Sequence, residues 1–220
     1  IVDLDQPIMN DLQSVMILEG ITNRRDYWSH YSFQGINVPR VSEILEATIG
    51  KTYLIKWALT LGDRYYKETK DTFAIGSFVH DMIEYYLRYH EDMEPEIYSD
   101  KIRDTVYVAY NNYKLWQKNK EAHGYTITPL EIEYPIVTPY YGGTCDCIMN
   151  ISKNGISRNY LMDFKTSKQI SVDYFLQIYF YLWGLNWLRQ YCDPNIPIID
   201  GGIGVIRVDK FTPDLYEDSI

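Results

Sequence analysis

The 220-residue sequence predicts an α/β fold in which helices flank a central mixed β-sheet, with a mainly helical amino-terminal portion. Up to about residue 123, apolar residues recur at intervals of three and four, the period of an amphipathic helix. After Gly124 the period changes to two, which is typical of strands with one buried face. A further helical stretch and a final apolar strand follow. This order of elements indicates helices packed around a mixed sheet.

Five segments carry the helical period, and several have signals at their ends. Ser42 and Glu43 follow Pro39, as at a helix start, and Gly50 matches the end of that helix. Ser99 precedes a long fourth helix. The predicted helices are 42–50, 53–70, 73–93, 100–123 and 173–191.

Four segments are predicted to be strands. The second and third are joined by the polar turn Lys153-Asn154-Gly155, which is typical of a hairpin. No internal repeat or linker-like stretch interrupts the chain. We therefore expect one domain over residues 1–220, mainly helical over 1–123 and built on the sheet over 124–220. The predicted strands are 125–137, 141–152, 156–166 and 198–209.

Composition narrows the classes of function. The chain has 46% hydrophobic residues, no apolar run as long as a membrane span and a start without signal-peptide character, so we expect a soluble, cytoplasmic protein without a membrane partner. A net charge of −9 argues against coating nucleic acid by charge alone, although an enzyme with a local basic groove is compatible with it. Cys145, Cys147 and Cys192 form neither a disulfide framework nor a C-x-x-C pattern, and we expect them to be reduced.

Charged residues lie inside two of the predicted strands, where a buried charge needs a reason. In YLMDFKTSK, residues 160–168, Asp163 and Lys165 share one face of the strand. A neutralising pair on a solvent face is one explanation. On the preceding strand, Asp146 is expected on the face opposite the thiols of its two cysteine neighbours.

A hairpin between these strands would bring Asp146 and Asp163 to one face, near the same end of the sheet, with Lys165 beside them. Two carboxylates about 4 Å apart repel by roughly 4 kcal/mol at an effective dielectric constant of about 20, and one lysine offsets only part of this. A hard divalent cation removes that cost. Gly142 and Gly143 come just before Asp146 and leave room for a ligand or another backbone to approach.

Four short motifs follow one another along the chain. They are GSFVH ending at His80, G-x-x-D from Gly143 to Asp146, D-x-K from Asp163 to Lys165, and Q-x-x-x-Y from Gln177 to Tyr181. In this order they resemble the PD-(D/E)XK nuclease superfamily, and in particular its RecB-like exonuclease branch. The segment VPRVSEIL is similar to the opening of phage-type members of that branch. The resemblance extends from about residue 39 to about residue 209.

The resemblance implies a restriction-endonuclease-like core and a metal-dependent DNA exonuclease that hydrolyses phosphodiester bonds. It implies Mg²⁺ or Mn²⁺ as the cofactor and a bacterial or phage-encoded protein of DNA repair or recombination, whose helicase or recombinase partner stays open. Many relatives hold an iron–sulfur cluster with four cysteines, whereas this chain has three, so we expect no cluster.

The resemblance also assigns roles to individual residues. Asp146, Asp163 and the backbone carbonyl of Phe164 would bind the metal ion, with His80 completing or adjoining its ligands. Lys165 would orient the attacking water and counter the charge that develops on the phosphate.

Three further residues are candidates with weaker signals. Glu133 would act on the metal through water or support one of its ligands, and Glu131 shares its strand face and competes for this role. Gln177 and Tyr181 would brace the site or contact the nucleic-acid backbone. His80, Gln177 and Tyr181 also fit ordinary packing of a helix face.

The helix predicted over 100–123 combines cations with aromatic residues, a pattern that can stack bases while following phosphates. We favour the simpler interpretation, in which the aromatic residues belong to the core and the cations form a solvated face. The residues concerned are Lys101, Arg103, Lys114, Lys118 and Lys120 with Tyr110, Tyr113 and Trp116.

The path of the chain bears on the expected substrate. Because His80 must reach a site formed by Asp146 and Asp163, we expect the helices of residues 41–123 to arch over the active-site end of the sheet. A roofed site admits a threaded single strand more easily than a duplex, so we expect activity on single-stranded ends. Alternatives on the same fold are a structure-specific or nicking endonuclease and a catalytically silent nucleic-acid-binding module.

Overall fold

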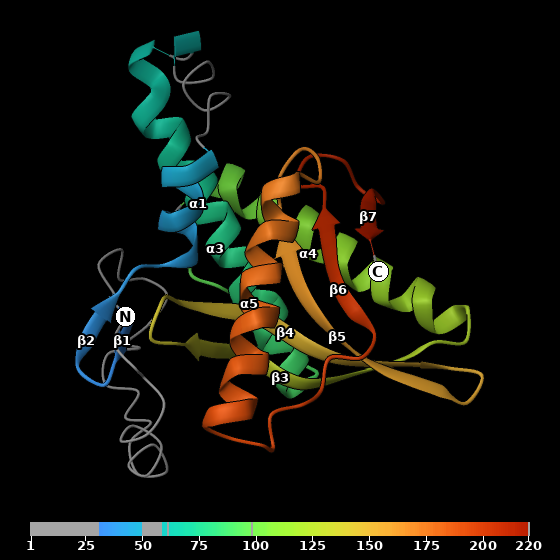
Figure 1. Cartoon of the computed structure of the whole chain (residues 1–220). Helices are drawn as coiled ribbons and strands as arrows, with labels where there is room; N and C mark the ends of the chain where they lie inside the picture. Colours follow the sequence, from blue (N-terminus) through green and yellow to red (C-terminus); the bar gives the residue numbers. More distant parts are fainter. Residues whose placement is uncertain (1–30, 50–58, 61, 98, 220) are drawn as a thin grey trace.

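The computed structural model describes residues 31–49, 59–60, 62–97 and 99–219, which form an α/β fold around a mixed five-stranded sheet (Figure 1). The strands lie in the order β3-β4-β5-β6-β7, and neighbours are antiparallel except for the parallel pair β5 and β6. The sheet strands are β3 Thr126–Val137, β4 Gly142–Lys153, β5 Ile156–Lys165, β6 Gly202–Val208 and β7 Tyr216–Ser219. The predicted α/β class and mixed sheet are confirmed.

Helices cover both faces of this sheet, so the described chain has three layers (Figure 1). Helices α3 and α4 pack on one face, and α1 and α5 pack on the other. The parallel pair follows from the crossover through α5, which returns the chain to the same end of the sheet. The helical elements are α1 Val41–Ile49, the short 3₁₀ turn η1 Gly62–Arg64, α3 Tyr65–Tyr89, α4 Asp100–Ala122 and α5 Val172–Tyr191.

The β4–β5 hairpin sets the register that matters for function. Its ladder runs from Lys153 opposite Ile156 to Cys147 opposite Met162. The two-residue turn places Asn154 at φ 53° and Gly155 at φ 79°, as a type I′ turn requires. The predicted hairpin and turn are therefore confirmed.

Prolines explain why β3 lies at an edge of the sheet. Pro129 and Pro135 both lie within β3, and a proline cannot donate a hydrogen bond to a neighbouring strand. One side of β3 is therefore poorly suited to pairing, and the strand pairs only with β4 within the five-stranded sheet.

Two local predictions differ from the structure. Two helices were expected over 53–70 and 73–93, but α3 runs without a break through residues 70–73, because no glycine or proline interrupts the helix there. The start of the first of these helices, and the stop at Gly50, lie outside the described residues. α3 ends at Tyr89, four residues earlier than expected, and its cap residue His90 has a left-handed backbone with φ 57°.

Three short strands were not predicted. They are β1 Tyr31–Phe33 and β2 Ile36–Val38, which form a small separate hairpin, and β7 at the outer edge of the main sheet. Strands of three or four residues show too few alternations for a period of two to be recognised. In the described part of the chain, no helix is both long enough and apolar enough to cross a bilayer.

Candidate active site

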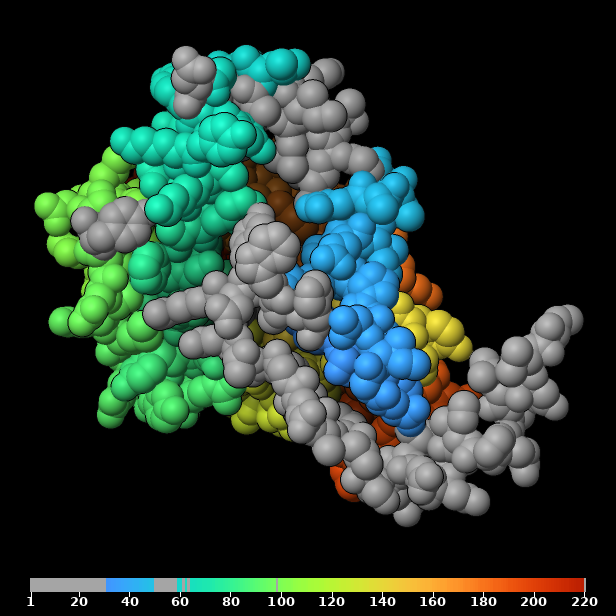
Figure 2. Space-filling model, turned by 90° about the vertical axis from the view of Figure 1, so that its left-hand side faces the viewer, coloured from blue at the N-terminus to red at the C-terminus, as the bar shows by residue number. Residues whose placement is uncertain are grey.

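A cavity of about 420 Å³ lies where the start of β4 meets the end of β5. Its other walls come from the start of α1, the middle of α3 and the inner side of α5. Figure 2 shows this side of the molecule, with a hollow between α3 (teal) and α1 (blue). Six of the residues singled out by the motifs line this cavity: His80, Asp146, Asp163, Lys165, Gln177 and Tyr181.

The two aspartates are brought together by the hairpin register. Asp146 and Asp163 directly follow the last pair of the ladder, Cys147 opposite Met162, and both line the same cavity. They are only 5% and 2% exposed. A solvent-face charge pair does not describe them, because burial of ionised carboxylates at this depth is costly without a compensating cation.

Asp146 is tied to the neighbouring strand through its side chain. Its Oδ2 accepts a hydrogen bond of 2.7 Å from the backbone N–H of Phe164. The N–H and C=O of one strand residue point to the same edge, so the carbonyl of Phe164 also faces β4 and Asp146. The expected carbonyl ligand is therefore on the correct side of β5.

His80 approaches Asp146 from α3, one of the two helices that pack on the face of the sheet opposite α1 and α5. Its Nδ1 lies 3.4 Å from Oδ1 of Asp146. Its ring meets Phe164 edge-on, with centroids 6.2 Å apart. Buried neighbours on the same helix, Val79 and Met82, anchor α3 in the core and thereby fix the position of His80.

Lys165 forms an ion pair with Asp163, with Nζ 2.5 Å from Oδ2, although the two groups are not aligned as a hydrogen bond. Burial raises the pKa of Asp163 to about 6, because the lysine only partly offsets desolvation and the nearby Asp146. Burial alone would lower the pKa of Lys165, but the carboxylates of Asp163 and Asp146 outweigh it and raise that pKa. Lys165 therefore stays a cation at neutral pH.

Glu133 is the acidic residue of β3 that approaches the site. One ligand atom from each of His80, Glu133 and Asp146 lies within 4.8 Å of the other two, a spacing that suits a metal ion. Glu131, which competed for this role, faces Ile148 in the ladder and is not part of the cluster. Asp163 also stands apart from this cluster and faces Lys165 instead.

The backbone conformation of Glu133 explains why sequence patterns indicated only weakly that this residue lies at the site. It has φ 53°, a conformation that is uncommon for a residue other than glycine. Such outliers gather at functional sites, because the surrounding structure must hold them in place. Strand alternation assumes an extended backbone, so it carries no signal for this conformation.

The prediction that Cys145 and Cys147 share one face of the sheet is wrong. Cys145 and Cys147 were expected on one face, but Cys147 packs with α3 and α4 whereas Cys145 packs with α1 and α5. Their partners on β3, Tyr134 and Ile132, divide in the same way. The change of face coincides with Glu133, where regular alternation ends. All three cysteines of the chain are free thiols.

The glycine pair before Asp146 makes room for neighbouring parts of the protein. The N–H of Gly142 donates to the carbonyl of Pro39 at 2.9 Å, so the expected approach of another backbone is confirmed there. At Gly143 the neighbour is a side chain, because a Cβ added there would lie 2.4 Å from Cε1 of Tyr181. Tyr181 in turn accepts a hydrogen bond of 2.9 Å on its hydroxyl from Nε2 of Gln177. The Q-x-x-x-Y motif thus braces α5 against β4.

The basic and aromatic residues of α4 do not form a stacking platform. Tyr110, Tyr113 and Trp116 are buried against the sheet, as the simpler interpretation predicted. Lys114 pairs with Asp92 at 2.7 Å. Two further α4 cations are also paired, Arg103 with Asp100 and Lys120 with Asp218.

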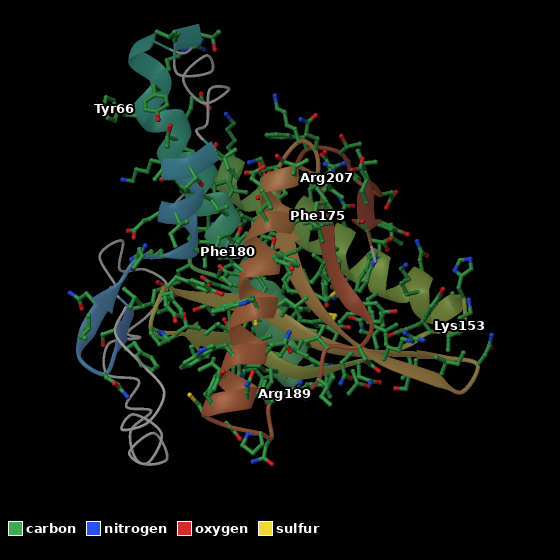
Figure 3. All side chains as sticks on the ribbon, viewed as in Figure 1. Tyr66, Lys153, Phe175, Phe180, Arg189 and Arg207 are labelled. Atoms are coloured by element: carbon green, nitrogen blue, oxygen red, sulfur yellow. The ribbon has the colours of Figure 1, made fainter. Side chains whose placement is uncertain are left out.

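The expected arch of helices is only partly present in the described residues. α4 lies flat on the sheet, because its aromatic side chains are needed for the core. α1 and α3 flank the cavity from opposite sides. The segment between them includes residues 50–58 and 61, which are outside the described part. At the far end of α3, Tyr66 projects outward and is 83% exposed (Figure 3).

No family model matches the chain, and no curated protein matches its sequence.

Proposed function

We propose that this chain is a metal-dependent deoxyribonuclease of the PD-(D/E)XK type, with a restriction-endonuclease-like core, and that it acts as an exonuclease on single-stranded ends. The observation that carries the proposal is the burial of Asp146 and Asp163 side by side on neighbouring strands. Lys165 and His80 lie at the same cavity. These four residues come from three of the sequence motifs, and Gln177 and Tyr181 of the fourth motif line the same cavity.

The donor set fits a divalent cation. The cluster of His80, Glu133 and Asp146 offers two carboxylate oxygens and an imidazole nitrogen, and the carbonyl of Phe164 faces the same edge. Oxygen-rich sites of this kind suit Mg²⁺ and Mn²⁺. A bound ion would lower the pKa of a water molecule and neutralise charge on the phosphate. Asp163 lies next to the cluster and becomes available when its pairing with Lys165 is relaxed.

The protein's own groups prepare the site for a phosphodiester. Lys165 stays a cation because the carboxylates of Asp163 and Asp146 outweigh the effect of burial, so it can stabilise negative charge that develops on a phosphate oxygen. Its ammonium also lies 5.1 Å from the ring centroid of Tyr174, which limits the directions it can take. Tyr181 packs against Gly143 and accepts a hydrogen bond from Gln177, so this part of α5 is held against β4. Lys165 is therefore positioned before the substrate arrives.

The size of the cavity favours single strands. A volume of about 420 Å³ flanked by α1 and α3 is small beside a duplex with a width of roughly 20 Å. An exposed aromatic residue, Phe73, lines the cavity and offers a surface on which an unpaired base can stack. Threading of an end explains how a strand reaches the buried aspartates.

The test uses end-labelled linear and covalently closed circular single strands, each with Mg²⁺, Mn²⁺ or EDTA. We expect linear strands to be shortened to small products only with metal, and circles to survive. Degradation of circles would replace the exonuclease proposal with the endonuclease alternative. Binding without cleavage under all conditions would favour the silent module. Asp163→Asn is the matched control for contaminating nuclease, because it should remove activity in every arm.

A further inference from the structure

A second cavity, of about 380 Å³, adjoins the first on the side of the loops that follow β5 and β6. The two cavities share Phe73, His80, Lys165 and Gln177 in their walls. The second cavity therefore adjoins the proposed catalytic centre: it is bordered by His80 but not by Glu133 or Asp146 of the metal cluster. Its wall also contains Thr72, Thr166 and Lys210, which belong to none of the sequence motifs.

Lys210 forms part of the wall of this second cavity. It is only 9% exposed, and burial lowers its pKa. Within the described part of the chain, no carboxylate lies within ion-pair distance of its ammonium, which lies 5.6 Å from the ring centroid of Phe211. Asp209 and Lys168 act on it only at longer range and with opposite signs.

Lys210 differs in this respect from the other buried cations at this end of the sheet. Arg207 contacts Asp209 and Glu217, each at 3.1 Å, and Lys165 contacts Asp163. The Lys210 ammonium keeps some contact with solvent, but no described carboxylate neutralises it at close range, so it is suited to bind an anionic ligand. The position of Lys210 at a cavity wall gives such a ligand access.

The rest of the wall suits a phosphate group. Ser42, Thr72 and Thr166 contribute hydroxyl groups from three different elements. The first turn of α5 also borders the cavity, and the amino end of a helix attracts anions. Asp173, in that turn, opposes an anion; its Oδ1 accepts a hydrogen bond from the hydroxyl of Ser171, and Lys165 and Lys210 in the same wall supply two positive charges.

The loop that carries Thr166 is held in place by a hydrogen bond from β6. Nη1 of Arg207 donates a hydrogen bond of 3.1 Å to the carbonyl of Ser167. In Figure 3, Arg207 lies at the same end of the sheet as Phe175 in the first turns of α5. The loop after β5, the start of α5 and the residues after β6 are thus joined around one cavity, which is a fixed wall rather than a chance surface depression.

We propose that this second cavity is a phosphate-binding subsite in which Lys210 is the cation, and that it holds a phosphate of the substrate strand next to the one being cleaved. The proposal rests on the proposed nuclease function for the identity of the strand. The phosphate is either an internal diester or a terminal group, and both share the chemistry of the site. Lys210 is a substrate-positioning residue, since it lies beside the catalytic cavity rather than at the metal cluster.

The test compares Lys210→Met, which keeps the length of the side chain and removes its charge, with Lys210→Arg, which keeps the charge. Lys168→Met is the matched control, because Lys168 is a nearby lysine that does not line the cavity. Binding of a short labelled oligonucleotide is measured by fluorescence anisotropy in EDTA at several salt concentrations, so the readout does not depend on cleavage.

We expect Lys210→Met to weaken binding roughly tenfold. It should also reduce the slope of log K against log salt by about 0.7, the value for one phosphate contact on a single strand. Lys210→Arg should keep most of the affinity, and Lys168→Met should change it much less than Lys210→Met. Equal effects of the two methionine variants, or no effect of Lys210→Met, would overturn the proposal.

Three versions of the oligonucleotide identify the phosphate: one with a 5′-phosphate, one with a 3′-phosphate and one with neither. An equal loss in all three supports an internal diester, and a loss confined to one version supports that terminal group. Thermal unfolding supplies a second readout, because removing an unpaired buried charge should leave the melting temperature unchanged or raise it. A large fall would show that Lys210 has a structural partner and would overturn the proposal.

These outcomes are separate from those of the nuclease proposal. Metal-dependent cleavage with normal binding by Lys210→Met would retain the nuclease and refute the subsite. Loss of binding in Lys210→Met by a protein that never cleaves would retain the subsite and refute the nuclease.

Discussion

The contact between Gly143 and Tyr181 makes a sharp prediction, because it joins the G-x-x-D and Q-x-x-x-Y motifs. Replacing Gly143 with alanine adds a Cβ at 2.4 Å from Cε1 of Tyr181 and 3.1 Å from its Cζ and Oη. Carbon atoms in favourable contact are about 3.5–4.0 Å apart, so the ring must retreat by roughly 1 Å. We expect Gly143→Ala to destabilise the protein.

The magnitude follows from how little room the ring has. Tyr181 is buried between Ile178 and Leu185 on α5, and both of these neighbours are also buried. Overpacking in such a core costs about 1–3 kcal/mol. For a chain of this length each kcal/mol lowers the melting temperature by roughly 2–4 °C, so the expected fall is about 2–12 °C.

Gly76 supplies the matched control for glycine replacement. It lies in the middle of α3, and an added Cβ would be 3.7 Å from Oγ1 of Thr166, an ordinary contact. Alanine is a better helix former than glycine, so Gly76→Ala should stabilise the protein by about 0.5–1 kcal/mol. The two substitutions are chemically identical and should have opposite signs.

Both variants are measured by urea and thermal unfolding followed by circular dichroism. The decisive measurement repeats Gly143→Ala in a Tyr181→Ala background, where the ring is gone. There the alanine at residue 143 should have almost no effect, which corresponds to a coupling energy of about 1–3 kcal/mol. The same cost in both backgrounds, or no cost in the wild type, would refute the packing of α5 against β4.

Three further predictions concern the aspartates and the lysine. Asp163→Asn and Lys165→Ala should each lower cleavage by about 10²–10³-fold while circular dichroism shows a folded protein; activity within a few-fold of wild type would contradict the assignment. Mn²⁺ or Mg²⁺ at a hundredfold excess over its Kd should stabilise the wild type by about 2.7 kcal/mol in thermal unfolding. This stabilisation should shrink in Asp146→Asn but persist in the control Asp92→Asn; an unchanged shift in Asp146→Asn would place the metal elsewhere. Because burial raises the pKa of Asp163 from 3.8 to about 6, the native state binds this proton more tightly than the unfolded chain. In EDTA, therefore, the wild type should lose stability relative to Asp163→Asn as the pH rises through this window, and a difference independent of pH would show that Asp163 is not buried in this way.

Much of the site's location was accessible from sequence because hairpins are local. The turn at Asn154 and Gly155 and the alternation of the flanking strands predicted the pairing that brings Asp146 and Asp163 together. The helical period around His80 predicted its element but not its partner. The distance of 3.4 Å to Asp146 required the packing of α3 across the sheet.

Other parts of the site carried no local signal. The left-handed backbone of Glu133 depends on how β3 is held against β4 and α3. Strand alternation therefore could not decide whether Glu133 or Glu131 lies near the metal cluster. The division of Cys145 and Cys147 between two cores follows from the same irregularity. Lys210 belongs to none of the sequence motifs. Its burial without a carboxylate partner depends on how the loops after β5 and β6 pack near the start of α5, which the sequence does not show.

The sequence by itself determined the α/β class, the hairpin and the chemical types of the candidate site, because periodicity and turn residues act over a few neighbouring positions. Only the tertiary structure decided which charges are buried, which of them pair and which side chains fill the space beside Gly143. Burial and pairing depend on contacts between residues far apart in the chain. The energies that distinguish a solvated lysine from Lys210, or a surface pair from Asp163 and Lys165, arise only when those distant segments exclude water together.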